Sequence, residues 1–406
     1  MTGVLKAGSR ILLVHSADDA YGSDRVLVSV AEYLCQTHTQ VRALLPDDTS
    51  PGWLTERLTE MGVEVRRGPL GVARRRYLNK GNLPKYVVSV ARARQFVKAQ
   101  INAFDPEVVY LNTSALIVGG LLGRRHRWSI IWHIHEIIQH PRWLAWLFRR
   151  LPLKADQVIA VSEAVFRHLC GNAGPSDRVT LLRNGIAPRA LHAKPRLPPL
   201  RVCFAGRLSE WKGYHVFLDA AIELASHGEP IDFIIAGDPL PNEQWRTEEI
   251  QSAVARRALS SQIRVIGFHS NIPELFDSVH VVVVPSILPD PLPTVVLEGM
   301  RSGCVVIAAR HGGAVEMIEE GVSGFLVTPS DAGSLQRAIL RVLAEPGLID
   351  DIGLAAWTRV ASEFTTEVFW QNLSPVFSHA IDLASSRRRR DRCKGGTSIP
   401  GSMTRA

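Results

Sequence analysis

The sequence predicts an α/β protein with two doubly wound domains, each built on a parallel sheet. Apolar runs of strand length alternate with helical patterns along most of the 406 residues. Most of these runs are continuous and rich in β-branched residues, as in strands that are buried on both faces. The alternation stops once, in a proline-rich stretch, and then begins again. A chain of this length is expected to hold two or three domains.

The first domain is predicted over residues 1–190. Helical patterns separate its expected strands, which lie at 11–15, 41–45, 63–65, 108–111, 130–134 and 158–162. Because alternating strands and helices give a parallel sheet with helices on both faces, this segment is predicted to be doubly wound.

Residues 191–200 are predicted to form a linker, because the stretch 186–200 holds four prolines and no clear period. The second domain is predicted over 201–365. Its expected strands lie at 202–206, 233–237, 263–267, 281–285, 304–309 and 324–327. We expect a final helix over 366–386 and a basic, disordered tail over 387–406.

Composition excludes several classes of protein. The five cysteines lie far apart and include no CxxC pair, which disfavours a disulfide scaffold and a zinc site and favours a reducing cytosol. No apolar span is long enough for a transmembrane helix, and the N-terminus lacks the apolar core of a signal peptide. A cytoplasmic location is therefore expected.

Positive charge is concentrated in the first half of the chain. Residues 1–196 hold 28 basic and 15 acidic side chains, and 65–104 holds ten Lys or Arg and no acid. This stretch is either a solvated basic face or a surface for anionic lipid or a phosphate-bearing substrate. The segment 140–154 mixes Trp and Leu with Arg and Lys, which suits either a membrane interface or a core-facing helix with a basic outer side. The basic stretch has no zinc, RRM or KH signature, so nucleic acid is not expected as a partner.

In doubly wound sheets, ligands bind beyond the carboxyl ends of the strands. The strand at 202–206 is followed by GRLSEWKG (206–213), in which Arg207 and Lys212 stand ahead of a helical pattern. Two cations beside a helix N-terminus suit a diphosphate, and the alternative is a pair of surface charges on a loop. The segment lacks the GK[ST] pattern of a P-loop.

The strand at 281–285 is followed by a second group of polar residues. Asp290 lies on a proline-rich loop, and Glu298 lies about one turn into a helix that begins near Thr294. The unpaired N–H groups of Thr294 and Val295 at such a helix start suit a phosphate, and the two carboxylates suit sugar hydroxyls. The alternatives are a turn residue for Asp290 and a helix-surface acid for Glu298.

Two positions of the first domain are further candidates. Gly22 follows the first strand, where a backbone without Cβ can approach a ligand closely. Ser23 or Asp24 could instead cap the next helix. The run IIWHIHE (130–136) ends in His135 and Glu136, at a place where a lone His is otherwise a packed polar residue, and His133 shares the face of His135.

Together these motifs resemble the family 4 glycosyltransferases from about residue 10 to 385. The family places an acid, seven residues and a Glu at the start of a helix, and this chain has Asp290 and Glu298 in that pattern. The other segments that carry the resemblance are GRLSEWKG, VIAVSEAV (158–165), RNGI (183–186) and GFHSNIPELFDSVHVVVVPS (267–286). The chain has Asp where the first acid is more often Glu, Ser23 where a second glycine is usual, and His280 where Asp is common.

The resemblance implies the GT-B architecture, in which two Rossmann-like domains face each other across a cleft. It implies a retaining transfer of a sugar from a nucleotide-diphosphate sugar to a hydroxyl acceptor. Arg207, Lys212, Thr294 and Val295 would bind the diphosphate, Glu298 the ribose, and Gly22 the donor. Asp290 and His135 would orient the sugar. No DxD motif is present, so neither a metal nor another cofactor is expected.

The acceptor is expected on the basic first domain. A lipid-linked or saccharide acceptor in bacterial cell-surface glycan synthesis would fit it, with the protein peripheral on the inner face of the membrane through 65–104 and 140–154. Two alternatives stay open within the architecture: another enzyme, such as a nucleotide-sugar epimerase or an inverting transferase, and an inactive scaffold that binds a nucleotide sugar. A nucleic-acid-binding protein is the third.

Overall fold

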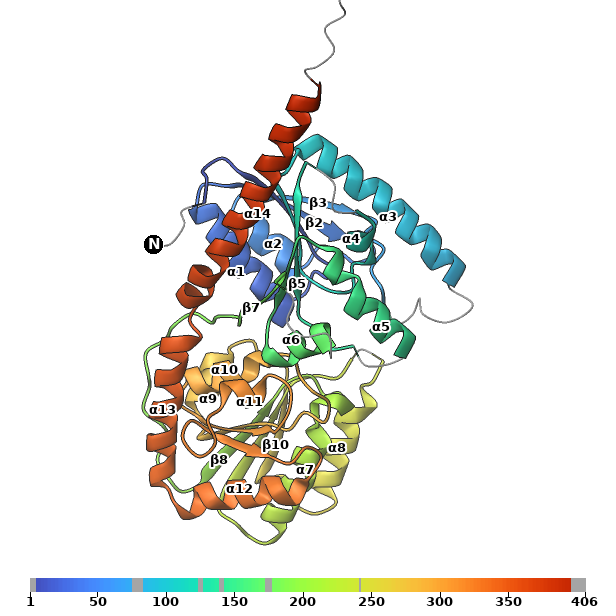
Figure 1. Cartoon of the computed structure of the whole chain (residues 1–406). Coiled ribbons are helices and arrows are strands. Elements are labelled where there is room, and N and C mark those ends of the chain that lie inside the picture. The colour runs from blue at the N-terminus through green and yellow to red at the C-terminus, as the bar shows by residue number, and fades with distance from the viewer. Residues whose placement is uncertain are drawn as a thin grey trace, which may run out of the picture. The chain divides into compact units, whose positions relative to one another are not determined.

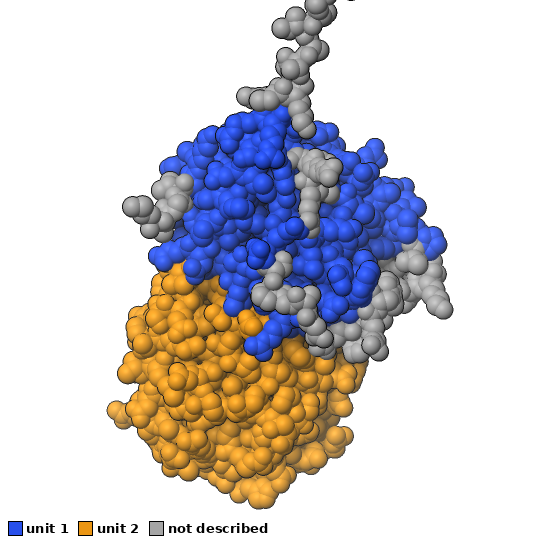
Figure 2. All heavy atoms as spheres, viewed as in Figure 1, with its two compact units in different colours: residues 1–161, 165–182, 369–406 blue, residues 162–164, 183–368 orange. Residues whose placement is uncertain are grey.

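The chain divides into two units, each with a parallel sheet flanked by helices (Figure 1). The computed structural model describes residues 5–74, 83–122, 127–138, 142–171, 177–240 and 242–395. Figure 2 colours unit 1 blue (1–161, 165–182 and 369–406) and unit 2 orange (162–164 and 183–368). In the described residues, no helix has the length and apolar character needed to cross a membrane.

Unit 1 contains a seven-stranded parallel sheet in the order β3-β2-β1-β4-β5-β6-β7. The strands are β1 (Arg10–Val14), β2 (Gln40–Pro46), β3 (Glu64–Gly68), β4 (Val108–Leu111), β5 (Ser129–Ile134), β6 (Gln157–Ala160) and β7 (Val179–Leu181). The helices are α1 (Gly22–Gln36), α2 (Trp53–Glu60), α3 (Leu83–Phe104), α4 (Ile117–Leu122), α5 (Arg142–Arg150), η2 (Pro152–Lys154), α6 (Glu163–Cys170) and most of α14 (Thr366–Gly395). The strand β7 is an addition to the predicted set.

One face of this sheet is covered by α1, α2 and α14. Ile11 and Leu13 alternate along β1 toward that face and are fully buried with side chains of all three helices. Tyr110 of β4 stacks on Phe377 of α14, with ring centroids 5.6 Å apart. Burial of this apolar area is the main term that joins the C-terminal helix to the first unit.

The C-terminal helix extends further than predicted. The sequence placed its end at 386 and a disordered tail over 387–406, but α14 continues to Gly395, and residues 396–406 lie outside the described part. The prediction failed because the arginines have partners in unit 1. Arg387 pairs with Asp156 at 2.6 Å, and Arg388 donates to the carbonyl oxygen of Pro106 at 2.8 Å.

Unit 2 contains a six-stranded parallel sheet in the order β10-β9-β8-β11-β12-β13. The strands are β8 (Leu200–Ala205), β9 (Ile231–Ala236), β10 (Ile263–Gly267), β11 (Val281–Val284), β12 (Val305–Ala309) and β13 (Phe325–Val327). The helices are η4 (Glu210–Lys212), α7 (Tyr214–Ser226), α8 (Trp245–Ala255), α9 (Ile272–Asp277), α10 (Thr294–Arg301), α11 (Ala314–Met317), α12 (Ala332–Ala344) and α13 (Gly347–Glu363).

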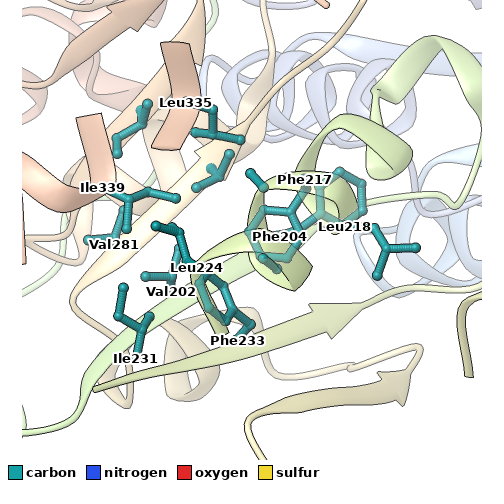
Figure 3. Packing of buried hydrophobic residues seen from close by; sticks show 14 of the residues in the cluster. Val202, Phe204, Phe217, Leu218, Leu224, Ile231, Phe233, Val281, Leu335 and Ile339 are labelled. Atoms are coloured by element: carbon teal, nitrogen blue, oxygen red, sulfur yellow. The ribbon is translucent and has the colours of Figure 1, made fainter. Parts of the chain in front are cut away.

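The core of unit 2 lies between its sheet and the helices α7, α8 and α12. Figure 3 shows Phe204 of β8, Phe217 of α7 and Phe233 of β9 turned toward one another, and their ring centroids lie 5.9 Å apart in each neighbouring pair. Leu335 and Ile339, one turn apart on α12, complete this cluster. Side chains four residues apart on α12 and alternate side chains of the strands thus pack into one apolar layer.

Residues 183–190, which the sequence assigned to the first domain, contact unit 2. Arg183 pairs with Glu316 at 2.8 Å, and Arg189 donates to the carboxylate of Asp277 at 2.5 Å. These side-chain partners lie far along the chain, so the proline pattern could not mark this boundary.

Candidate functional site

The candidate residues of unit 2 gather where the strand order reverses. β9 and β10 follow β8 on one side, whereas β11, β12 and β13 extend from its other side, so β8 and β11 form the switch point of the sheet. In doubly wound sheets, ligands bind beyond the carboxyl ends of the strands at such a switch point. GRLSEWKG follows β8, and the loop with Asp290 follows β11.

Backbone contacts hold these two loops together. The N–H of Ile287 donates to the carbonyl oxygen of Trp211 at 2.8 Å. Gly213 has φ +74°, and a Cβ added there would lie 1.9 Å from the carbonyl oxygen of Pro285. Only glycine satisfies both the left-handed backbone and this close approach. The loop that carries Lys212 is therefore held against the end of β11.

The two loops also share an ion pair. Nζ of Lys212 lies 2.5 Å from Oδ2 of Asp290, and 4.1 Å from the ring centroid of Trp211. Asp290 is buried, and its carbonyl oxygen accepts a hydrogen bond from the N–H of Gly313 at 2.8 Å. Asp290 is thus more than a turn residue, because its side chain neutralises the cation of the neighbouring loop.

The helix α10 is pressed closely onto the sheet. A Cβ added to Gly299 would lie 2.9 Å from Cγ2 of Val306 and 3.3 Å from Cβ of Val282, so only glycine permits this spacing. Glu298 is 7% exposed, which corrects the alternative of a helix-surface acid. Thr294 is the first residue of α10 and Val295 the second, and no side chain caps the helix. Their N–H groups lie at the positive end of the helix dipole.

Arg207 is the second residue after β8 and is half-buried. The next residue, Leu208, donates its N–H to the carbonyl oxygen of Asp238 at 3.1 Å, which ties this loop to the end of β9. The structure therefore places Arg207, Lys212, Asp290, Thr294, Val295 and Glu298 on the loops and the helix that follow β8 and β11.

Gly22 and His135 lie in unit 1. Gly22 is the first residue of α1, and the residue before it caps the helix without a side-chain hydrogen bond. Neither Ser23 nor Asp24 is a cap. His135 directly follows β5, and its Nε2 lies 2.9 Å from Oδ1 of Asn112. Burial, together with the neighbouring His133 and His15, holds the pKa of His135 well below its usual value, so the ring is neutral near pH 7.

The partners of His135 were not among the residues predicted from the sequence. Asn112 directly follows β4, and His15 directly follows β1, and these two strands form the switch point of unit 1. Nδ2 of Asn112 lies 3.3 Å from Nδ1 of His15, whose Nε2 lies 3.1 Å from Oδ1 of Asp24. The sequence signal that could have identified His15 and Asn112 is a polar residue directly after the apolar run of β1 and of β4.

His280, at the position where the family commonly has Asp, joins backbone segments. Its Nδ1 accepts from the N–H of Arg201 at 2.8 Å, which leaves Nε2–H to donate to the carbonyl oxygen of Pro195 at 3.0 Å. This residue ties the start of β11 to the linker. Nowhere in the described residues do three or more His, Cys, Asp or Glu side chains form a group that could hold a metal ion.

Two family patterns match most of the chain. Residues 21–189 match the family described as Glycosyltransferase Family 4, and residues 191–357 match the one described as Glycosyl transferases group 1.

Individual relatives are more distant. The chain is 26% identical over 239 residues to "Amylovoran biosynthesis glycosyltransferase AmsK" of Erwinia amylovora. The aligned region covers 56% of this chain and 58% of that protein. It is 27% identical over 245 residues to "Putative colanic acid biosynthesis glycosyltransferase WcaL" of Salmonella typhimurium. That alignment covers 57% of this chain and 57% of the relative. The match thus spans little more than half the length of these relatives.

Among solved structures, the chain is similar to Anabaena Alr3699/HepE in complex with UDP. The TM-score is 0.74 at 23% identity, over 91% of this chain and 100% of the other. This likeness confirms the predicted fold, two doubly wound domains of the GT-B kind.

Proposed function

Because this chain belongs to family 4 of the glycosyltransferases, we propose that it transfers a sugar from a nucleotide-diphosphate sugar to a hydroxyl acceptor, with retention at the anomeric carbon. The observation that carries the proposal is the ion pair of Lys212 and Asp290 at the switch point of unit 2. Asp290 lies four residues before the N-terminus of α10. Cations, helix-start amides and buried carboxylates on adjoining loops suit the phosphates and hydroxyls of one donor.

Electrostatic stabilisation of the leaving diphosphate is the proposed source of the acceleration of sugar transfer. Arg207, Lys212 and the N–H groups of Thr294 and Val295 would oppose the negative charge that grows as the glycosidic bond breaks. Each well-placed donor of this kind contributes about 3 kcal/mol. Without a donor, Asp290 neutralises Lys212. When the diphosphate binds Lys212, the Asp290 carboxylate becomes available to a sugar hydroxyl.

The remaining residues position the donor. Glu298 would accept hydrogen bonds from the ribose hydroxyls, and His135 and Gly22 of unit 1 would contact the sugar and its phosphates. The acceptor oxygen attacks the anomeric carbon on the face that the diphosphate leaves, and the departing phosphate takes the acceptor proton. This scheme uses no protein nucleophile, metal or other cofactor.

The acceptor is proposed to be a lipid-linked or saccharide hydroxyl. The support is that the relatives carry names of amylovoran and colanic acid biosynthesis, both pathways of glycan assembly. We place the protein on the cytoplasmic side of a bacterial membrane, where nucleotide sugars would be its donors.

A nucleotide panel tests the donor site first. A ligand at 100 times its dissociation constant adds about 2.7 kcal/mol to the free energy of unfolding. We expect a rise in Tm with one nucleoside diphosphate and its sugar, lost in Arg207→Met. No rise with any nucleotide at millimolar concentration would contradict the proposal. The anomeric configuration of the product then separates retention from inversion, and donor binding without turnover would indicate a scaffold.

Association with an anionic membrane is the second part of the proposal. On α3, Val87 and Val88 are 62% and 52% exposed beside the exposed Lys85 and Arg92, and Trp146 of α5 is 57% exposed. Apolar side chains among cations suit an anionic lipid surface. The stretch 75–82 within 65–104, and residues 140–141 within 140–154, lie outside the described residues.

Vesicle sedimentation tests this association. The protein should sediment with vesicles that contain phosphatidylglycerol and not with phosphatidylcholine alone, and Val87→Ser with Val88→Ser should weaken sedimentation. The matched control is Val322→Ser, an exposed valine of unit 2. Equal sedimentation with both lipids, or with neither, would contradict membrane association through charge.

A further inference from the structure

A buried hydrogen-bond network lies at the switch point of unit 1. It joins His15 after β1, Asn112 after β4 and His135 after β5, the strand of the three that Figure 1 labels. Asn112 is completely buried, and His15 is 1% exposed. Such a network is stable only when every donor meets an acceptor, so the geometry restricts where each proton lies.

The orientation of the Asn112 amide is fixed by a backbone group. One polar atom of its side chain lies 2.8 Å from the carbonyl oxygen of Ser23, in the first turn of α1. A carbonyl oxygen can only accept, so this atom must be the NH₂ nitrogen. The other atom, which lies 2.9 Å from Nε2 of His135, is therefore the amide oxygen.

The amide oxygen in turn fixes the tautomer of His135. Because an amide oxygen can only accept, Nε2 of His135 must carry the proton. Burial holds the pKa of this ring well below its usual value, so the ring is neutral and Nδ1 has no proton. A neutral ring in this tautomer accepts one hydrogen bond, at Nδ1, and a hydroxyl group is a suitable donor for it.

The proton positions at the other end of the network, at His15 and Asp24, are restricted in the same way. The second proton of the Asn112 NH₂ group faces Nδ1 of His15, so Nδ1 accepts and Nε2–H donates to Oδ1 of Asp24 at 3.1 Å. Oδ1 of Asp24 also accepts from the N–H of Asp19 at 3.3 Å. All the hydrogen bonds therefore run in compatible directions, and the loop before α1 is tied to the ring of His135.

We propose that Asn112 is a positioning residue for sugar transfer, which holds His135 in the Nε2–H tautomer so that Nδ1 accepts a hydrogen bond from a hydroxyl of the donor sugar. This inference rests on the proposed function, because it assigns the network a role in that reaction. Asn112 also donates to the carbonyl oxygen of Ser23, the residue after Gly22, so the same amide holds the first turn of α1.

Nitrogen NMR of the free protein tests the tautomer without any substrate. In protein labelled with ¹⁵N at histidine, the signals of His135 are those lost in His135→Gln. We expect Nδ1 of His135 to have the shift of an unprotonated ring nitrogen and Nε2 that of a protonated one. The reverse pattern in the wild type would overturn the proposal, even if no variant of Asn112 folds.

The variant Asn112→Leu removes both polar atoms at similar volume. We expect a loss of the single Nε2–H tautomer and a fall in kcat of about tenfold, the loss of one well-placed hydrogen bond, with little change in the KM for the donor. An unchanged tautomer would overturn the proposal, and a changed tautomer with unchanged kcat would overturn its link to transfer.

The matched control is Ser129→Ala, at the opposite end of β5. Its hydroxyl donates to the carbonyl oxygen of Ala380 at 2.7 Å, and the residue is fully buried. This variant should lower Tm but leave the His135 signals and kcat unchanged. If the wild type transfers no sugar, the proposed function fails while the NMR result still decides whether Asn112 fixes the tautomer.

Discussion

Unit 1 and unit 2 have the same doubly wound architecture, and both place their candidate residues at a switch point, but they hold those residues by different means. In unit 2, backbone contacts hold the two loops together. The N–H of Ile287 donates to the carbonyl oxygen of Trp211, and Gly213 lies against the carbonyl oxygen of Pro285. In unit 1 the side chains of His15, Asn112 and His135 bond one another.

The difference follows from the charge of the groups that are held. Backbone contacts join the loops that carry Lys212 and Asp290, and the two charged side chains pair with each other until a diphosphate and a sugar would meet them. A neutral imidazole has no charge to offer, so its proton must be directed by a hydrogen-bond partner, which at His135 is the side chain of Asn112. Four predictions test this comparison.

Replacement of Lys212 in unit 2 should have the largest effect, a fall in the rate of sugar transfer. In Lys212→Met, kcat/KM for sugar transfer should fall about a hundredfold, the equivalent of about 3 kcal/mol of stabilisation of the leaving charge. Arg264→Met, which removes an exposed cation of β10, is the control for net charge. A Lys212→Met protein with the kcat/KM of the wild type would show that the ion pair only stabilises the fold.

The backbone contact of unit 2 is tested by two alanine variants. Gly213 and Gly228 both have left-handed backbones, with φ +74° and +76°, but an added Cβ meets Pro285 only at Gly213. We expect Gly228→Ala to cost about 1 kcal/mol, and Gly213→Ala about 2 to 3 kcal/mol because a clash is added. Urea denaturation measures both. Equal losses would mean that the two loops are not tightly joined.

The burial of His133, whose ring packs on His135 of the unit 1 network with centroids 4.1 Å apart, predicts a loss of stability in acid. Burial lowers the pKa of His133 to about 3, whereas in the unfolded chain it is about 6.5. The stabilising contribution is complete above pH 6.5. It falls by about 1.4 kcal/mol per pH unit as the pH drops toward 3, because only the unfolded chain binds the proton.

His133→Phe should therefore flatten the dependence of the free energy of unfolding on pH, measured in urea between pH 7 and 5.5. The exposed His227 provides the control, since His227→Gln should keep the wild-type slope. An unchanged slope in His133→Phe would show that the ring is protonated in the folded state.

The smallest effect is expected at the C-terminal helix. Arg387→Gln removes a charge-assisted bond to Asp156, whose side chain is 4% exposed, and should cost about 1 kcal/mol of the free energy of unfolding. Arg390→Gln, at an exposed position of the same helix, should cost almost nothing. Equal costs would indicate that the arginines act only through the helix and not through unit 1.

The sequence predicted the elements of the fold well because their signals are local. Continuous β-branched runs such as VVVV at 281–284 become buried strands, and Gly213 and Gly299 stand where loops and helices meet the sheet closely. The pattern of Asp290 and Glu298 also lies within one short segment. The helix α14 extends beyond its predicted end at 386, and residues 183–190 contact unit 2, because contacts with distant residues set both.

The sequence by itself determined two doubly wound domains, the family, and the residues that follow β8 and β11, since strand periods, turn glycines and motif spacing are all written locally. Only the tertiary structure decided that Lys212 pairs with Asp290, 78 residues away, and that Asn112 bonds His15, 97 residues away. The physical reason is that a hydrogen bond or ion pair depends on distances of about 3 Å between side chains, and the packing of parallel strands brings such residues together.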